Sequence, residues 1–341
     1  MGISTDAQRS GNTSYCRSIE ALTQIVMHRT MHPYKRFDFP FRFSNEYQKQ
    51  QEALKVVDAF YEEIIRSKRE AYSELPEEDE ASKQNFLDQL LRYQENGEAL
   101  SDKDIKDEIN TFVLGGHDTT ATALSFTLYC LARHPEVQEK ILEEQEKIFG
   151  SLENEPQTTY ADLQEMKYMD AVINESIRVF PPIPMIGRKL TGDIQLDSYL
   201  VYVDRGTVDG CLCYAVDSRC RTAMDNESQD NGLTLPDTMS VVCALYALHH
   251  NPKYFSDPEK FDPERFVKDE ILPHTHLPFS TGPRNCIGKK FAILQIKSCI
   301  SKIVRHFKLL PSVPEYDPEL VCQITLASQN GIRISLQKRN R

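Results

Sequence analysis

The sequence predicts a mainly α-helical fold with a small β part late in the chain. Apolar residues recur at helical spacing over 15–31, 45–70 and 101–133, and one more long helix is expected over 288–307. Strand-like segments occur only after the proline cluster at 181–184. With 40% hydrophobic residues in 341, the chain can bury one large core or two modest ones.

Caps and prolines mark the ends of the other predicted helices. Ser101 and Asp104 have the spacing of a capping box before the helix that runs to about residue 133. Pro135 begins the next helix. Two short helices are expected over 160–169 and 169–180, and the proline cluster ends the second.

Three segments are predicted to lack regular structure. They are the aromatic segment 32–43, which two prolines interrupt, the acidic segment 75–82, and the proline-rich coil 252–266. The tail, with Asn330-Gly331 between alternating residues, predicts a hairpin turning at that dipeptide.

A second hairpin is predicted between segments that are far apart in the chain. Residues 194–197 and 231–236 would join naturally around an Asp-Asn-Gly turn, but residues 198–230 separate them. We interpret these 33 residues as a segment foreign to the fold, a retained intron or a gene-prediction error. A genuine surface insertion is the alternative, and sequencing the transcript across the join decides between them.

Composition excludes several classes of protein. The excess of 51 acidic over 40 basic residues, a net charge of −11, disfavours a nucleic-acid binder. Nine irregularly spaced cysteines in a long chain predict a reducing compartment and no disulfide framework. Cys211, Cys213 and Cys220 lack C-x-x-C pairs and a nearby histidine, which disfavours zinc. No apolar run approaches the roughly 20 residues that span a bilayer.

One short loop carries the strongest chemical signal. Phe279, Gly282, Arg284, Cys286 and Gly288 occur at fixed spacing before the last long helix. A cysteine thiolate is a metal ligand, and glycines on either side let a flat cofactor approach the backbone. An arginine can pair with a carboxylate of that cofactor, and the helix N-terminus favours an anionic sulfur. The alternative is a buried structural cysteine in a glycine loop.

This loop resembles the cysteine loop of cytochrome P-450 proteins, F-x-x-G-x-R-x-C-x-G, and three further segments agree in the order of that family. The resemblance implies a cytochrome P-450 fold lacking its N-terminal portion, with residues 1–341 as a single partial domain. It implies haem b, bound through the Cys286 thiolate, with Phe279, Gly282, Arg284 and Gly288 around it.

The first further segment lies inside the long helix. Gly115 and Gly116 cost about 1 kcal/mol each against alanine in a helix interior, so they need a reason. Small residues let the helix approach a bound group. The resemblance assigns these glycines to the haem and assigns proton delivery to Asp118 and Thr119. The alternative is a kinked core helix.

The second and third segments surround the proline cluster. Glu175 and Arg178 share one helix face. By resemblance they are buried and joined by Arg265 of a Pro-Glu-Arg-Phe segment, with a structural role in holding the cysteine loop. Arg188 is implied as a partner of the second haem carboxylate, with an exposed strand residue as the alternative.

The segment around Gly115 resembles the family-four clan of cytochromes P-450, which is associated with hydroxylation of fatty acids and related lipids. Many members have glutamate where this chain has Gly115, and that glutamate forms an ester to the haem. Gly115 cannot form it, so haem is expected to bind non-covalently. The chain has no tryptophan, and its start resembles an internal helix of the family. We therefore expect an N-terminal truncation.

The resemblance implies a haem-thiolate monooxygenase that inserts one atom of dioxygen into an apolar substrate, a fatty acid or another lipid-like or xenobiotic molecule. Electrons would come from NADPH-cytochrome reductase, with cytochrome b5 as a further donor. The implied location is the endoplasmic reticulum membrane, the microsomal fraction, with membrane association through a missing N-terminal anchor. The alternative is a non-catalytic truncated fragment that binds haem weakly or not at all.

Overall fold

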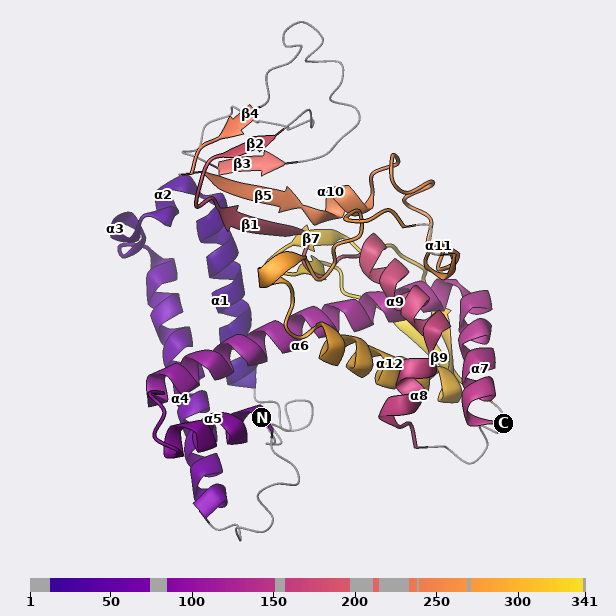
Figure 1. The fold of residues 1–341 in the computed structure, drawn as a ribbon, viewed down its shortest axis with the longest axis horizontal. Coiled ribbons are helices and arrows are strands. Elements are labelled where there is room, and N and C mark those ends of the chain that lie inside the picture. Colours follow the sequence, from indigo (N-terminus) through magenta and orange to yellow (C-terminus); the bar gives the residue numbers. More distant parts are fainter. Residues whose placement is uncertain are drawn as a thin grey trace, which may run out of the picture. The chain divides into compact units, whose positions relative to one another are not determined.

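The computed structural model confirms a mainly helical fold with a small β part (Figure 1). It describes residues 13–73, 85–150, 157–196, 211–214, 233–237, 239–268 and 271–339. These residues form two compact units that divide after His117. The single partial domain stays a prediction.

The first unit is built from helices. They are α1 (Thr13–Met31), α2 (Pro33–Arg36), α3 (Asp38–Phe41), α4 (Asn45–Ser73), α5 (Phe86–Glu95) and the beginning of α6 (Asp102–Arg133). The predicted helices over 15–31 and 45–70 are thereby confirmed as α1 and α4. Apolar side chains of α4, α5 and α6 form the core, namely Val57, Tyr61, Ile64, Ile65, Leu87, Leu91, Ile105 and Ile109. The hydroxyl groups of Tyr15 and Tyr61 lie 2.8 Å apart where α1 packs on α4.

Two parts of this unit differ from the sequence prediction. The segment 32–43 was expected to be a loop, but it contains α2 and α3. Pro33 lies in the first turn of α2, where its missing N–H removes no helical hydrogen bond. Helix α5 was not predicted, although Asn85 and Asp88 form a capping box at its start. The acidic segment 75–82 lies outside the described residues.

The capping box of α6 is confirmed. The Ser101 hydroxyl accepts a hydrogen bond from the Asp104 N–H at 3.2 Å, and the Asp104 carboxylate accepts one from the Ser101 N–H at 2.9 Å. Two of the N–H groups at this helix end that have no helical partner are thus satisfied. The helix then runs without interruption to Arg133, and its two ends contribute to different cores.

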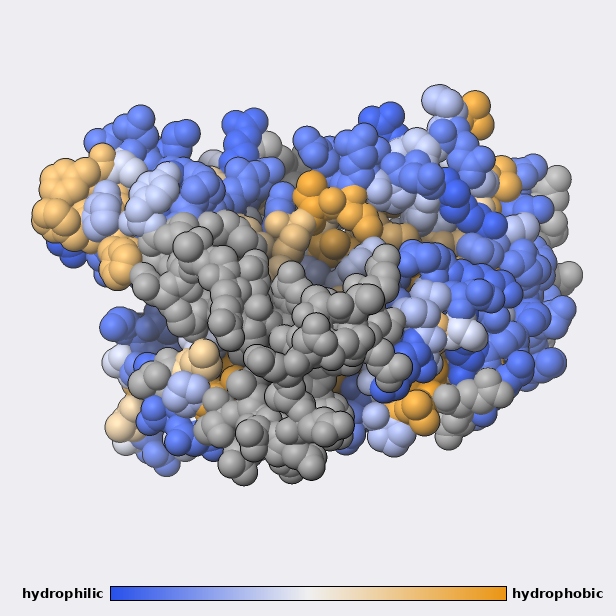
Figure 2. Space-filling view, turned by 90° about the horizontal axis from the view of Figure 1, so that it is seen from above, coloured by the Kyte–Doolittle hydropathy of each residue, from blue (hydrophilic) through white to orange (hydrophobic). Residues whose placement is uncertain are grey.

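An aromatic surface marks the connection between α1 and α4. Tyr34, Phe37, Phe39 and Phe43 are each more than half exposed. Figure 2 shows hydrophobic residues gathered at its left edge, where α3 lies in Figure 1. Among the described helices, none is long and apolar enough to cross a membrane.

The second unit contains the remaining helices. They are the rest of α6, α7 (Pro135–Phe149), α8 (Tyr160–Glu165), α9 (Lys167–Val179), α10 (Leu245–His249), α11 (Glu264–Val267), a 3-10 turn η2 (Gly282–Arg284) and α12 (Lys289–His306). Four of them, α6, α7, α9 and α12, supply most of one apolar core. The predicted helices here are confirmed, with ends shifted by a few residues, while α11 begins inside the segment 252–266 that was predicted to be coil.

Helix α12 is fixed to its neighbours by buried polar contacts. The Lys297 ammonium donates to the Leu163 carbonyl at 2.7 Å and lies 2.8 Å from an Asp170 carboxylate oxygen. The Ser301 hydroxyl donates to the Gln145 side chain at 2.7 Å. Hydrogen bonds between buried groups favour one position of the helix, and α12 begins directly after the cysteine loop.

Short strands accompany these helices. β1 (Met185–Lys189), β5 (Ser240–Ala244) and β3 (Cys211–Tyr214) form one sheet in the order β1-β5-β3. β2 (Ile194–Leu196) pairs antiparallel with β4 (Leu233–Leu235), which confirms the predicted pairing of these distant segments. Of residues 198–230 only the backbone of β3 is described, and their interpretation as a foreign segment stays a prediction.

The predicted tail hairpin is wrong. β8 (Leu326–Ser328) pairs with β7 (Leu320–Cys322), whereas β9 (Ile334–Lys338) pairs with β6 (Phe307–Pro311). The turn at Asn330-Gly331 does form, with a positive φ at Gly331. However, the Asn330 side chain bonds to the backbone of Asp317 and Glu319, so it fastens the turn to an upstream segment instead of closing a hairpin.

Candidate haem site

The cysteine loop is closed by a backbone hydrogen bond between the ends of the motif. The Cys286 N–H donates to the Phe279 carbonyl at 2.9 Å, and the chain between them turns through η2. Gly282 has a φ of +77°, in the left-handed region where a side chain would be strained. The glycine at this motif position is therefore required by the turn itself.

The sulfur of Cys286 lies at the N-terminal end of α12. A Cβ placed on Gly288 would be 3.9 Å from the Cys286 Sγ, so the sulfur is next to the residue that caps the helix. The first N–H groups of an 18-residue helix carry a partial positive charge that favours an anion. This position suits a thiolate ligand.

The loop exposes the side chains that a flat cofactor would cover. Cys286 is exposed, and the two apolar side chains near it, Ile287 and Phe291, are 85% and 69% exposed. Exposed apolar side chains beside an exposed thiol at a helix N-terminus fit a large apolar group with a metal centre. Arg284 is exposed, and its guanidinium can pair with an acidic group of that cofactor.

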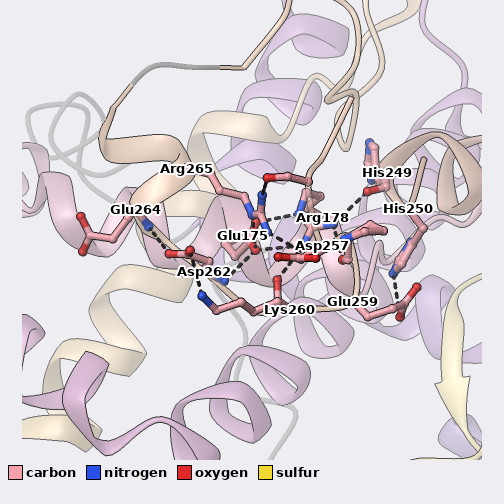
Figure 3. Close-up of polar contacts among 12 residues, drawn as sticks. Glu175, Arg178, His249, His250, Asp257, Glu259, Lys260, Asp262, Glu264 and Arg265 are labelled. Carbon is pink, nitrogen blue, oxygen red and sulfur yellow. Dashed lines mark hydrogen bonds and ion pairs between the residues drawn. The ribbon is translucent and has the colours of Figure 1, made fainter. Parts of the chain in front are cut away.

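The predicted structural residues meet in one buried ion-pair cluster (Figure 3). Glu175 and Arg178 are fully buried, and two guanidinium nitrogens donate to the two carboxylate oxygens at 2.7 and 2.9 Å. The Arg265 Nε lies 3.4 Å from a Glu175 oxygen, and its other nitrogens donate to Ser256 and to the Asp257 carbonyl. The structure thus brings together the Glu175–Arg178 pair of α9, which the helical spacing predicts, and Arg265 of α11, which only the resemblance added.

Arg178 also organises the coil that precedes the cysteine loop. Its guanidinium donates to the carbonyl groups of His249, Pro258 and Lys260 at 2.9, 2.8 and 3.1 Å. The buried His249 ring continues the connection, because its Nε2 accepts the Leu277 N–H at 3.0 Å. Leu277 is two residues before Phe279, so a chain of hydrogen bonds runs from Glu175 to the start of the loop. The predicted role of the cluster requires such a connection.

His249 makes this connection sensitive to acid. Burial lowers the pKa of His249 to about 2, and burial also lowers the pKa of its neighbour His276 to about 3. The unfolded chain binds a proton at this histidine below about pH 6.5, while the folded chain does not. The free energy of unfolding therefore falls by about 1.4 kcal/mol per pH unit below pH 6.5 for His249.

Between pH 7 and pH 5, the free energy of unfolding should fall by roughly 2 kcal/mol more in the parent protein than in His249→Gln, because only the parent carries this histidine. Urea unfolding at several pH values measures the difference. His274→Gln is the control, since the His274 side chain is exposed. Equal losses in the parent and His249→Gln would contradict the prediction.

The predicted proton-delivery residues begin the part of α6 that belongs to the second unit. Asp118 is partly buried, and one of its carboxylate oxygens accepts a hydrogen bond from the Thr325 hydroxyl at 2.7 Å. Thr119 is partly buried. Thr325 has no recognisable signal in the sequence, because 207 residues separate it from Asp118.

The remaining predicted cofactor residues are Gly115 and Gly116 on α6 and Arg188 on β1. A Cβ on Gly115 or Gly116 would meet nothing within 4 Å, so both leave open space along α6. They belong to the first unit, and their approach to the cysteine loop stays a prediction. Arg188 is exposed on β1 and donates to the neighbouring Gly187 carbonyl at 2.8 Å. Its pairing with haem also stays a prediction.

Comparisons with known proteins agree along nearly the whole chain. The sequence model of the family described as cytochrome P-450 matches residues 1–209 and 212–331. Cytochrome P-450 4d2 of Drosophila melanogaster is 36% identical over 353 residues, covering 99% of this chain and 63% of that protein. Cytochrome P-450 4V2 of Rattus norvegicus is 32% identical, covering 100% of this chain and 60% of that protein.

A solved structure agrees as well. The structure described as retinoic acid bound cyanobacterial CYP120A1 superposes with a TM-score of 0.71 at 26% identity. The match covers 97% of this chain and 64% of that one. The chain thus spans less than two thirds of the length of these relatives. Family match, fold and cysteine loop agree, and the chain belongs to the cytochrome P-450 family.

Proposed function

We propose that this chain is the haem-binding part of a monooxygenase that catalyses RH + O2 + 2 e− + 2 H+ → ROH + H2O on an apolar substrate. The observation that supports it is the position of Cys286, an exposed thiol beside Gly288 at the N-terminus of α12. Haem bound there through a thiolate supplies the iron that activates dioxygen, and the thiolate favours O–O cleavage.

Each predicted residue has a defined task in this proposal. Cys286 binds the iron, Phe279, Gly282 and Gly288 shape the loop, and Arg284 pairs with a haem carboxylate. Arg188 is proposed for the second carboxylate, and Gly115 and Gly116 leave room for the ring without a covalent ester. Asp118 and Thr119 hold and transfer the protons that the reaction consumes.

The substrate is proposed to be a fatty acid or another lipid-like molecule. Two observations support it: the matched relatives include several cytochromes P-450 of family four, and one matched structure holds retinoic acid, an apolar chain with a carboxylate. The sequence has no recognisable motif that binds NADP or flavin. Electrons are therefore proposed to come from NADPH-cytochrome reductase, with cytochrome b5 as a second donor. Location at the endoplasmic reticulum membrane belongs to the same proposal.

A carbon-monoxide difference spectrum of the reduced, haem-reconstituted chain tests the function. A red-shifted Soret band is expected, because thiolate ligation of the haem iron would produce it. An unshifted band, or no bound haem, would favour the alternative of a chain that binds haem weakly or not at all. Product formation from dodecanoic acid with NADPH and reductase then tests the reaction.

A further inference from the structure

The hydrogen bond between Thr325 and Asp118 joins parts of the chain that the predicted site does not connect. Thr325 lies in the turn between β7 and β8 and is only 5% exposed, whereas Asp118 lies on α6. Their 2.7 Å contact is a hydroxyl donating to a carboxylate. Bonds to ionised acceptors are shorter and stronger than those between neutral groups, and burial strengthens them further.

The backbone around Thr325 is fixed on both sides. Its carbonyl accepts the Gln323 N–H at 3.0 Å, and the next N–H, that of Leu326, donates to the Pro182 carbonyl at 2.9 Å. Leu326 itself is buried. A β-branched side chain on a fixed backbone has few rotamers. The hydroxyl is therefore presented to Asp118 from a rigid position.

We propose that Thr325 is a positioning residue for Asp118. Through the neighbouring Leu326 N–H, which bonds to Pro182, it connects Asp118 to the proline turn at 181–184. This inference rests on the proposed function, because it concerns the direction in which the Asp118 carboxyl group faces when it takes up and passes on protons. With one oxygen held by Thr325, the carboxylate cannot rotate freely and its second oxygen points in one direction. A proton-transfer group within a fixed geometry acts selectively.

The consequence concerns two competing reactions. The productive one, RH + O2 + 2 e− + 2 H+ → ROH + H2O, needs protons delivered to one oxygen atom. The unproductive one, O2 + 2 e− + 2 H+ → H2O2, uses the same electrons and protons. An Asp118 carboxylate that turns freely delivers protons less selectively, so a larger share of electrons leaves as hydrogen peroxide.

The first test measures the contact without any activity. A double-mutant cycle compares the urea unfolding of the parent, Thr325→Val, Asp118→Asn and the double variant. We expect the two substitutions to be coupled, with about a tenfold non-additive change in the unfolding equilibrium constant. Thr275→Val is the matched control, because Thr275 is also buried but donates to the Leu272 carbonyl. It should show no coupling to Asp118→Asn.

The second test measures the fate of electrons, with dodecanoic acid as the probe substrate and NADPH with reductase as the donor. Thr325→Val should raise the ratio of peroxide to product severalfold, and Thr325→Ser should restore the parent ratio because it keeps the hydroxyl. In an Asp118→Asn background, Thr325→Val should have no further effect.

The outcomes separate this proposal from the proposed function. A parent without the red-shifted Soret band defeats the function, while the unfolding cycle still tests the contact. Additive unfolding effects overturn the positioning role, as does a Thr325→Val enzyme with the parent's peroxide ratio. If Thr325→Val fails to fold, Thr325→Ala replaces it in both tests with the same expected results.

Discussion

Cys286→Ser is expected to abolish the red-shifted Soret band of the reduced carbon-monoxide complex. A serine hydroxyl stays protonated at neutral pH and is a hard oxygen donor, whereas the cysteine thiolate is the soft ligand that this iron requires. The two residues have nearly the same volume, and position 286 is exposed. The loop should therefore fold as in the parent, and the free energy of unfolding of the haem-free protein should change little.

Cys16→Ser is the matched control for this substitution. Cys16 is also exposed but lies on α1 in the first unit. Its spectrum should be that of the parent. If Cys16→Ser lost the band, or Cys286→Ser kept it, the thiolate ligand would have to be assigned elsewhere, and the described alternatives are Cys16, Cys130, Cys243, Cys299 and Cys322.

Sequence reasoning predicted best where the signal is local. The α6 capping box depends on two residues three positions apart, and both of its bonds are present. The turn through Gly282 likewise depends on one short motif. Helix α5 was missed although it has an equally local signal, the capping box of Asn85 and Asp88. The local information that specifies α5 is therefore present in the sequence.

Prediction failed where distant segments compete for one strand. Asn330-Gly331 is a strong hairpin signal, and the turn forms as expected. The partner of β9 is nevertheless β6, which the local pattern does not specify. Similarly, the Thr325 hydroxyl reaches Asp118 only because a buried turn brings them together. A single sequence contains no local trace of contacts at such separations.

The ion-pair cluster was predictable from the sequence only in part. The i,i+3 spacing of Glu175 and Arg178 is local and common, and such a pair contributes little when exposed. Its importance comes from full burial and from the carbonyl groups that converge on Arg178, neither of which the spacing reveals. Only the resemblance to a family led to Arg265 as the third member.

Arg178→Met is expected to cause the largest loss of stability, about 3–5 kcal/mol. Methionine has a similar length, but it leaves the buried Glu175 carboxylate without its counter-charge. It also removes the donors to the carbonyl groups of His249, Pro258 and Lys260. Buried acceptors that lose their partners keep the cost of desolvation without any compensating bond.

Arg178→Lys distinguishes geometry from charge. A lysine keeps the positive charge but offers three donors on one atom, whereas the guanidinium nitrogens of Arg178 reach five acceptors in different directions. The free energy of unfolding of this variant should therefore still be lower than that of the parent by more than about 2 kcal/mol. If Arg178→Lys were as stable as the parent, the positive charge alone would explain how Arg178 stabilises the fold. The directed hydrogen bonds of the guanidinium would then contribute little.

Glu264→Gln is the control for both variants. Glu264 is adjacent to Arg265, yet its carboxylate points away from the cluster in Figure 3 and pairs with Lys140 at 2.7 Å. The side chains of Lys140 and Glu264 are 49% and 37% exposed, so loss of this pair should cost less than about 1 kcal/mol. Urea unfolding of the haem-free proteins measures all three variants. Because Arg178 is connected through His249 to Leu277 and the cysteine loop, Arg178→Met should also weaken haem retention, whereas Glu264→Gln should not.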